Sequence, residues 1–185
     1  MTATNFSIPI GTQIISDGGG TVTVDGKAYR SVVTTTRPSN TTAYTAGDVV
    51  GSTSGSAIIT LSNIGPSGGY MLLQSAALIF SDSSVPSGMG SFRVHLYSSS
   101  PTAIADNAAY DLASADRSGY MGYFDFPAPV DFGSTLYTQT DYIGRMIKMA
   151  TSSTTLYAEI ETKGAYTPVS ASTVELRIST LEAGL

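Results

Sequence analysis

The sequence predicts an all-β fold class: an antiparallel two-sheet sandwich of jelly-roll type, with about eight strands and an extended N-terminal arm. Apolar and polar residues alternate along several segments, which is the pattern of antiparallel strands with one buried and one solvated face. Turns rich in glycine and proline separate these segments at short intervals, and no regular helix pattern lies between them. An immunoglobulin-like sandwich is the second candidate, because the absence of tryptophan and cysteine excludes only the antibody type.

The arm is predicted to comprise residues 1–20, which are polar, contain three consecutive glycines and show little periodicity. A solvated tail seldom carries many β-branched aliphatic residues, so those in the arm are candidate partner contacts. They are Ile8, Ile10, Ile14 and Ile15. A frayed terminus is the alternative. The segment has neither a basic start nor an apolar run, so no signal peptide is expected. The protein is therefore expected to be synthesised in the cytoplasm.

Residues 21–185 are predicted to form one domain, as is usual for a chain of this length. The eight candidate strands are rich in valine, isoleucine, threonine and tyrosine. They are 22–36, 57–64, 70–81, 92–97, 120–126, 142–150, 156–161 and 174–179. The Asp25-Gly26 pair is the strongest hairpin signal, and it predicts that 21–24 pairs with 27–33. A further strand is expected after Pro129.

The stretch 98–141 departs from the regular spacing of strands and turns. It begins with an irregular connection, in which 114–121 is predicted to hold one helical turn, with Ser114 as its cap and Asp116 near its positive end. Long connections in compact domains are usually functional or packed across an end of the fold. The candidate partner contacts in this connection are Asp106, Asn107 and Tyr110.

The composition excludes several classes of function. The chain has 9 basic and 14 acidic residues and a net charge of −5, whereas nucleic-acid binding depends mainly on clustered lysine and arginine. No apolar stretch reaches the ~18 residues of a membrane span, so neither nucleic acid nor membrane is expected as a partner. Without cysteine and with one histidine, disulfides, thiolate sites and multi-histidine metal sites are excluded, and no cofactor is expected. The 50 serine and threonine residues predict a hydroxyl-rich surface suited to proteins or glycans.

Glu159 and Glu161 are the only closely spaced glutamates. On a strand, residues two apart project from one face with Cα atoms roughly 6.5–7 Å apart, which is in the range of a glycosidase carboxylate pair. The alternation places both on the face opposite Leu156, Ala158 and Ile160. A solvated outer face explains the pair without catalysis, and this is the favoured interpretation.

Other candidate sites also have simpler interpretations. The five-residue spacing of Asp106, Asp111 and Asp116 raises the question of a calcium site, but it matches no compact motif, and an Asx turn at Asp106-Asn107 is favoured. His95 is predicted to be a surface residue in a cross-strand polar pair. The densest aromatic cluster of the chain could line a glycan-binding face, but the favoured interpretation places its phenylalanines in the core and its tyrosines at the rim. The cluster comprises Tyr120, Tyr123, Phe124 and Phe126.

Residues 37–51 are predicted to form a structural crossover between strands. Pro38 restricts Arg37 to extended geometry, and Ala46-Gly47-Asp48 suggests a turn before a strand that starts at Val49-Val50. Arg37 is expected to hold the crossover by bonding to backbone carbonyls or to Asp48. The residues assigned to the crossover are Arg37, Pro38, Tyr44, Gly47, Asp48 and Gly51.

This tract and a second one resemble a family of small virion proteins of tailed bacteriophages, which we associate with capsid decoration (cement) proteins. The second tract covers 95–110, followed by Ala115-Asp116-Arg117 and 119–122. The resemblance extends from about Arg37 to Gly122 and more loosely to the C-terminus.

The resemblance implies a non-enzymatic protein without catalytic residues, located on the outer surface of a virion capsid. Its expected partner is the assembled major capsid protein, and self-association as a trimer on local three-fold axes is expected to add avidity. A tail or fibre module that binds host glycan or another tail protein is the alternative. A carbohydrate-active enzyme that uses Glu159 and Glu161 is a third, weaker one.

Overall fold

The computed structural model describes residues 12–16, 21–25, 27–52 and 56–183, with side chains described outside 12–16 and 21–25. Strands dominate the described residues, and the only helical element among them is a single 3-10 turn, η1 (Ser114–Asp116). The strands are β1 (Thr12–Ser16), β2 (Thr21–Asp25), β3 (Ala28–Thr36), β4 (Val49–Val50), β5 (Ile59–Leu61), β6 (Tyr70–Phe80), β7 (Phe92–Tyr97), β8 (Tyr120–Phe126), β9 (Val130–Asp131), β10 (Leu136–Lys148), β11 (Leu156–Thr162) and β12 (Thr173–Ala183). The predicted all-β class is confirmed. Within the described ranges, no helix is long and apolar enough to cross a membrane.

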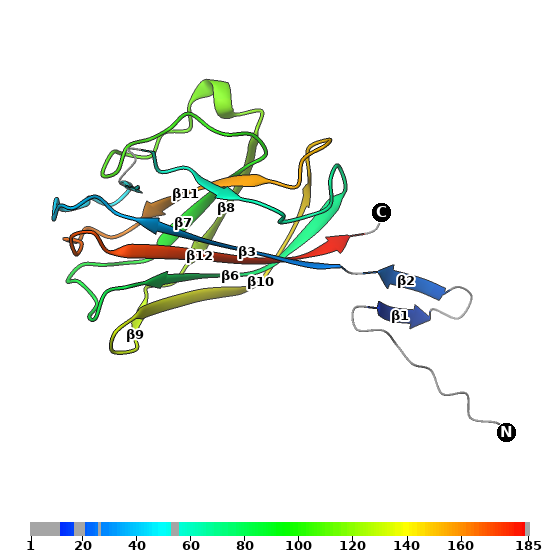
Figure 1. The fold of residues 1–185 in the computed structure, drawn as a ribbon, viewed down its shortest axis with the longest axis horizontal. Helices are drawn as coiled ribbons and strands as arrows, with labels where there is room; N and C mark the ends of the chain where they lie inside the picture. The colour runs from blue at the N-terminus through cyan, green and yellow to red at the C-terminus, as the bar shows by residue number, and fades with distance from the viewer. Residues whose placement is uncertain (1–11, 17–20, 26, 53–55, 184–185) are drawn as a thin grey trace.

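Two antiparallel sheets face each other and form the sandwich (Figure 1). The larger sheet has the order β3-β12-β6-β10-β9, and the smaller has the order β4-β11-β7-β8, with β5 also paired to β11. The sandwich has eight strands when β4 and β5 are counted as one and β9 is left out. They pair from the outside of the sequence inward: β3 with β12, β4 and β5 with β11, β6 with β10, and β7 with β8. This nested pairing is the winding of a jelly roll, so the predicted type is confirmed.

The core lies between the sheets and is built by strict alternation. In β12, Val174, Leu176 and Ile178 are each at most 1% exposed, while the residues between them face outward. Opposite them, β7 and β8 contribute aromatic side chains, and the rings of Phe80 and Phe92 meet across the two sheets at 5.1 Å. Burying one such side chain stabilises the fold by about 1.5–3 kcal/mol, so this interface holds the sheets together.

The predicted strands are present, with three differences. Segment 22–36 contains two strands, and the predicted hairpin at Asp25-Gly26 is wrong, because β2 pairs with β1 while β3 pairs with β12 along its whole length. The local turn signal cannot override this long-range pairing. The strand expected at 142–150 begins earlier, at Leu136. Within 57–64 only β5 is a strand, and the further strand expected after Pro129 is β9.

The predicted arm overlaps a separate two-stranded sheet, made of β1 and β2. This sheet draws residues from both sides of position 20, since β1 precedes it and β2 follows it. Of the candidate partner contacts, Ile8 and Ile10 lie outside the described residues. Ile14 and Ile15 lie in β1, where the backbone is described and the side chains are not.

Two loops cross closely at one end of the sandwich, where glycine is required. Gly88 has a φ of +84°, and a Cβ at this position would lie 2.1 Å from the carbonyl oxygen of Ala165. Gly164 in the second loop would place a Cβ 2.3 Å from the backbone nitrogen of Gly90. Any side chain at these positions would therefore push the two backbones apart.

Candidate functional site

The connection between β7 and β8, residues 98–119, covers the outer face of the smaller sheet (Figure 1). The Tyr110 ring stacks on the His95 ring with centroids 3.7 Å apart, and its hydroxyl lies 2.8 Å from that of Tyr97. The Asp116 carboxylate accepts a hydrogen bond from the Thr102 backbone N–H at 2.9 Å. The predicted helical turn is confirmed as η1, but Ala113 rather than Ser114 occupies the cap position, and no side chain caps it.

The crossover 37–51 and the connection that follows β7 meet at Asp106. Its carboxylate pairs with the Arg37 guanidinium at 3.2 Å and accepts hydrogen bonds from the Tyr44 hydroxyl and, at 2.8 Å, from the Gly51 N–H. Arg37 is 1% exposed, and it also donates to the Val169 carbonyl at 3.1 Å and to the Tyr44 hydroxyl. The expected bond from Arg37 to a carbonyl is therefore confirmed, but its acidic partner is Asp106 rather than Asp48.

This use of Asp106 could not be predicted from the sequence, because 69 residues separate it from Arg37 and no local pattern signals the pairing. The predicted Asx turn is wrong as a role for its side chain, since the carboxylate is directed to the crossover instead. Asn107, the next candidate contact, has a φ of 61° and is half-buried. This left-handed conformation is one that asparagine tolerates better than most residues.

Backbone hydrogen bonds extend the contact between the tracts. The Val49 N–H donates to the Ala108 carbonyl at 2.8 Å, and the Asn107 N–H donates to the Val49 carbonyl at 3.0 Å. The Tyr110 N–H donates to Gly47 at 2.8 Å. The connection therefore lies beside β4 like an additional edge strand. Asp48 stabilises the turn before β4 by accepting hydrogen bonds from the backbone N–H and the hydroxyl of Thr45.

Glu159, Glu161 and His95 are buried, which contradicts the predicted solvated face and the predicted surface histidine. They are 1%, 6% and 3% exposed, respectively. The predicted orientation away from the core is consistent with their register, because Glu159 is opposite His95 and Glu161 is opposite Arg93. What the strand pattern could not show is that the 98–119 connection lies over this face. Both faces of β7 and β11 are consequently covered.

Glu161 and His95 form a hydrogen-bonded chain under the connection. Glu161 accepts from Lys163 Nζ at 2.8 Å and lies 3.0 Å from His95 Nε2. Because a carboxylate only accepts, His95 Nε2 carries the proton and Nδ1 accepts from the Tyr120 hydroxyl, 3.0 Å away. Burial lowers the pKa of His95, an effect that the hydrogen bond to Glu161 opposes. The lowered pKa favours the neutral form of His95 at pH 7, and its two ring nitrogens both have partners.

Glu159 is less well satisfied than its neighbour. One carboxyl oxygen accepts a hydrogen bond from the Tyr97 hydroxyl at 3.1 Å. The other, Oε1, is buried and has no hydrogen-bond partner within the part of the chain that the structure describes. Burial raises the pKa of Glu159 to about 7, although the hydrogen bond from Tyr97 and the nearby backbone of Ile104 lower it. This carboxyl is the least stably buried charge in the cluster.

Asp106 and Asp116, two of the aspartates considered as calcium ligands, have other partners. Among the described residues, no three histidine, cysteine, aspartate or glutamate side chains come together as a possible ligand set. Asp106 is engaged by Arg37 and Asp116 by the backbone of Thr102.

The aromatic cluster of β8 divides as expected. Phe124 and Phe126 are buried in the core at 7% and 1% exposure. Tyr123 is 42% exposed, and the Arg93 guanidinium lies over its ring, 3.6 Å from the centroid. The predicted division between core phenylalanines and rim tyrosines is therefore confirmed.

No protein-family model matches this chain. No curated protein matches it either. Among solved structures, the chain is similar to one from desmodium yellow mottle tymovirus, with 10% sequence identity and a TM-score of 0.27, over 98% of this chain and 94% of that chain. The similar chain is viral, but at this TM-score the similarity supports no argument about function.

Proposed function

We propose that this chain is a non-enzymatic virion structural protein that decorates a bacteriophage capsid and stabilises it by binding the assembled major capsid protein. The observation that carries the proposal is the contact between the two tracts that resemble phage virion proteins. They lie far apart in sequence, and Asp106 joins them through Arg37, Tyr44 and Gly51. The resemblance therefore covers one packed unit of the fold.

The burial of Glu159 and Glu161 favours a non-enzymatic role over a carbohydrate-active enzyme. A glycosidase pair must reach the scissile bond of its substrate, whereas these carboxylates are 1% and 6% exposed. Glu161 is also engaged by Lys163 and His95. If such an enzyme activity existed, replacing both glutamates with glutamine should abolish it.

The mechanism in this proposal is mass action. A protein that binds only the assembled shell stabilises that state by RT ln(1 + [L]/Kd), which is about 2.7 kcal/mol per site at 100 times the Kd. Many copies, self-associated as trimers, would together resist internal DNA pressure. The N-terminal arm, the 98–119 connection and one sheet edge are the proposed contacts.

The edge next to β9 suits such a contact. Val130 in β9 and Phe132 just after it are 60% and 69% exposed, and the Phe132 ring packs edge-on against Tyr137 with centroids 6.0 Å apart. Large apolar side chains held in solvent at a sheet edge are typical of a protein–protein interface. These residues add a specific surface to the proposed capsid contacts.

The experiment that tests the proposal is to count copies of the protein per purified virion, by gel densitometry against the major capsid protein. A number in the hundreds, comparable to that of the capsid protein, is expected. A handful to a few dozen copies would favour the alternative, a tail or fibre module, and no copies would contradict any virion role.

A second test addresses the arm. Deleting residues 1–20 should weaken binding to expanded capsids while leaving the melting temperature nearly unchanged, because β1 pairs only with β2. A large fall in melting temperature would instead show that the arm is an integral part of the fold.

A further inference from the structure

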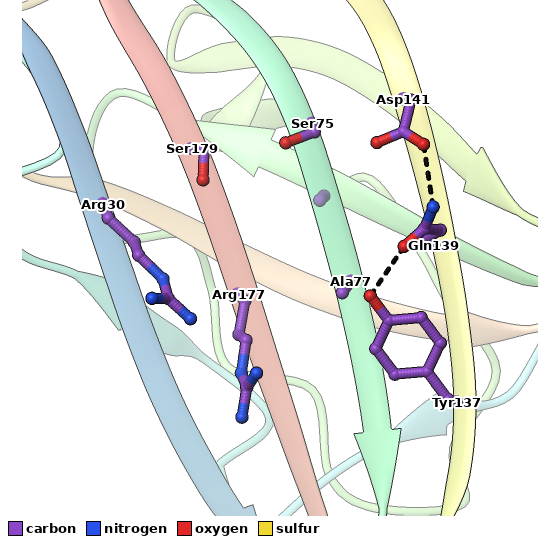
Figure 2. A pocket seen from close by; sticks show the side chains of 9 residues that line it. Arg30, Ser75, Ala77, Tyr137, Gln139, Asp141, Arg177 and Ser179 are labelled. Atoms are coloured by element: carbon purple, nitrogen blue, oxygen red, sulfur yellow. Dashed lines mark hydrogen bonds between the residues drawn. The ribbon is translucent and has the colours of Figure 1, made fainter. Parts of the chain in front are cut away.

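The outer face of the larger sheet contains a shallow groove of about 240 Å³, on the opposite side of the sandwich from the 98–119 connection. Figure 2 shows two arginines on β3 and β12, small side chains on β6 and a row of polar side chains on β10. The residues that line it are Arg30, Ser75, Ala76, Ala77, Tyr137, Gln139, Asp141, Arg177 and Ser179.

Strand register explains why the face is hollow there. One row across four strands runs from Arg30 through Ser179 and Ser75 to Asp141. The outer positions of a row this long are about 14 Å apart, because neighbouring strands are 4.7–4.9 Å apart. The middle positions carry only serines, so the floor is low between two taller walls. In the next row, Ala77 lies between Arg177 and Gln139, and its small side chain likewise keeps the floor low.

The two walls differ in chemistry. Arg30 has no hydrogen-bond or ion-pair partner within the described ranges, and Arg177 is held by a hydrogen bond from its Nε to Glu175. A guanidinium has five N–H donors, so Arg177 also keeps donors free for a ligand. This wall is therefore rich in donors, and its unpaired positive charge is that of Arg30, because the Glu175 carboxylate offsets the charge of Arg177.

The opposite wall, on β10, is a connected chain of polar groups. The Tyr137 hydroxyl donates to Gln139 Oε1 at 2.7 Å, and Gln139 Nε2 donates to Asp141 at 2.8 Å. The chain aligns these side chains along the strand and ends in a carboxylate, which accepts hydrogen bonds from hydroxyl groups. This wall is therefore rich in acceptors.

An irregularity in β6 pairing ends the groove just beyond Ser75. Its register shifts against β10 between Asp141 and Arg145, and against β12 between Ser179 and Thr180. Bulges of this kind bend a strand and re-aim side chains, and they are over-represented at sheet edges and next to active sites.

Tyr142 lies inside this bulge, directly after Asp141. Its φ is +56° and it is 93% exposed. A bulky residue in the left-handed region is strained, and such strain is concentrated at functional sites. The bulge thus holds a strained, solvent-exposed aromatic residue next in sequence to Asp141, outside the residues that line the groove.

From these observations we infer that the groove is a binding site for a carboxylated glycan. The Arg30 and Arg177 guanidiniums match a sugar carboxylate. The serines of the floor, Gln139 and Asp141 match sugar hydroxyls, and an exposed tyrosine ring such as that of Tyr142 provides an apolar face with a polar tip.

The same groups disfavour other ligands. A nucleic-acid backbone carries a phosphate at every nucleotide, and binding it needs a longer run of basic side chains than the two arginines of this groove. An extended peptide adds to a sheet through backbone groups at its edge, which this face lacks. The inference does not depend on the virion assignment, because it rests on the groove alone.

The test uses the full chain and four carboxylated oligosaccharides: tri-galacturonic acid, a hyaluronan tetrasaccharide, sialyllactose and a polysialic acid trimer. Each is compared with its methyl ester, which keeps the hydroxyls and loses the charge. Two-dimensional NMR should show saturable amide shifts at Ser75 and Ala77 with at least one acid, and at least tenfold weaker binding of its ester. If no acid shifts these amides, the groove is not a glycan site. If each methyl ester binds as tightly as its acid, the groove does not recognise the carboxylate.

Two variants and a control locate the binding. Arg30→Gln should weaken it at least tenfold, in line with the loss of a charged hydrogen bond, and Ala77→Trp should abolish it by filling the floor. Arg117→Gln removes the same charge from an exposed position on the other side of the sandwich and should have no effect. Equal losses in Arg30→Gln and Arg117→Gln would show general charge attraction and overturn the inference.

Discussion

Replacing Glu159 with glutamine tests whether a buried carboxyl makes this fold sensitive to pH. Glu159 is 1% exposed, accepts one hydrogen bond from Tyr97 and has its second oxygen unpartnered among the described residues. Burial raises its pKa from 4.5 to about 7. The carboxyl is therefore protonated in the folded protein under conditions in which the unfolded chain has already released the proton.

The sign and size of the effect follow from that difference. Between pH 4.5 and 7 the folded state binds more protons than the unfolded chain at this position, so stability falls as the pH rises and is constant above that range. At 1.36 kcal/mol per pKa unit the full loss is about 3 kcal/mol, and relaxation around the charge reduces it to about 2 kcal/mol. Glu159→Gln does not titrate, so this loss should disappear.

The assay is urea unfolding of both proteins at pH 4.5, 6 and 8. The free energy of unfolding of Glu159→Gln, minus that of the natural chain, should rise by about 2 kcal/mol across the series. His95 changes the stability in the opposite sense. Burial lowers its pKa, so the unfolded chain binds the proton more readily and the protein loses stability as the pH falls below 6.5. His95 is present in both proteins, so its contribution cancels in the difference.

Glu161→Gln is the matched control, two residues along the same face. Its carboxylate accepts from both Lys163 and His95, so this variant should be less stable by about 1–3 kcal/mol at neutral pH. If Glu159→Gln keeps the pH dependence of the natural chain, the raised pKa of Glu159 and the reasoning from its burial are wrong.

Three further predictions concern stability and binding. Asp106→Ala should lower the free energy of unfolding by about 3–5 kcal/mol in urea, because it leaves the buried Arg37 charge unpaired; a loss below 1 kcal/mol would contradict the anchoring role. Gly88→Ala should lower the melting temperature far more than Gly133→Ala, since both glycines have positive φ but only at Gly88 would a Cβ meet backbone; equal losses would point to φ alone. Phe132→Ser should leave the melting temperature unchanged and weaken capsid binding, whereas Val85→Ser, also at an exposed position, should leave both unchanged; unaltered binding by Phe132→Ser would remove the β9 edge from the contact.

The strands could be predicted because each depends on a pattern that repeats within its own segment. Their number, with no helix between them, favoured a jelly-roll type, but the strand order depends on pairings far apart in sequence. Alternation in β12 identifies which side chains are buried, and turn residues separate the strands. The false hairpin at Asp25-Gly26 shows the limit of local signals. A two-residue turn stabilises only the strands beside it, whereas β3 gains nine register pairs with β12 at the other end of the chain.

The burial of Glu159, Glu161 and His95 could not be predicted for a different reason. Alternation tells which side chains share a face but not what covers that face. Here a connection without regular strands covers it, and the contact of Tyr110 with His95 is specified by shape and stacking rather than by periodicity. The groove is intermediate: the small residues Ser75 and Ala77 on one face of β6 are a visible signal, but their meaning depends on the register that brings Arg30 and Asp141 to the same row.

The anchoring of the connection also affects how it could bind a partner. A segment of this length without regular structure would normally lose much conformational entropy on binding. In this protein, Asp106 and the backbone hydrogen bonds of Asn107 to β4 and of Tyr110 to Gly47 hold it on the sheet in the free chain. The surface of the connection is therefore ordered before any partner binds, so the conformational entropy of the connection is lost during folding and not on binding. The buried polar groups beneath it contribute to that order, because each paired group favours one position of the connection over its neighbours.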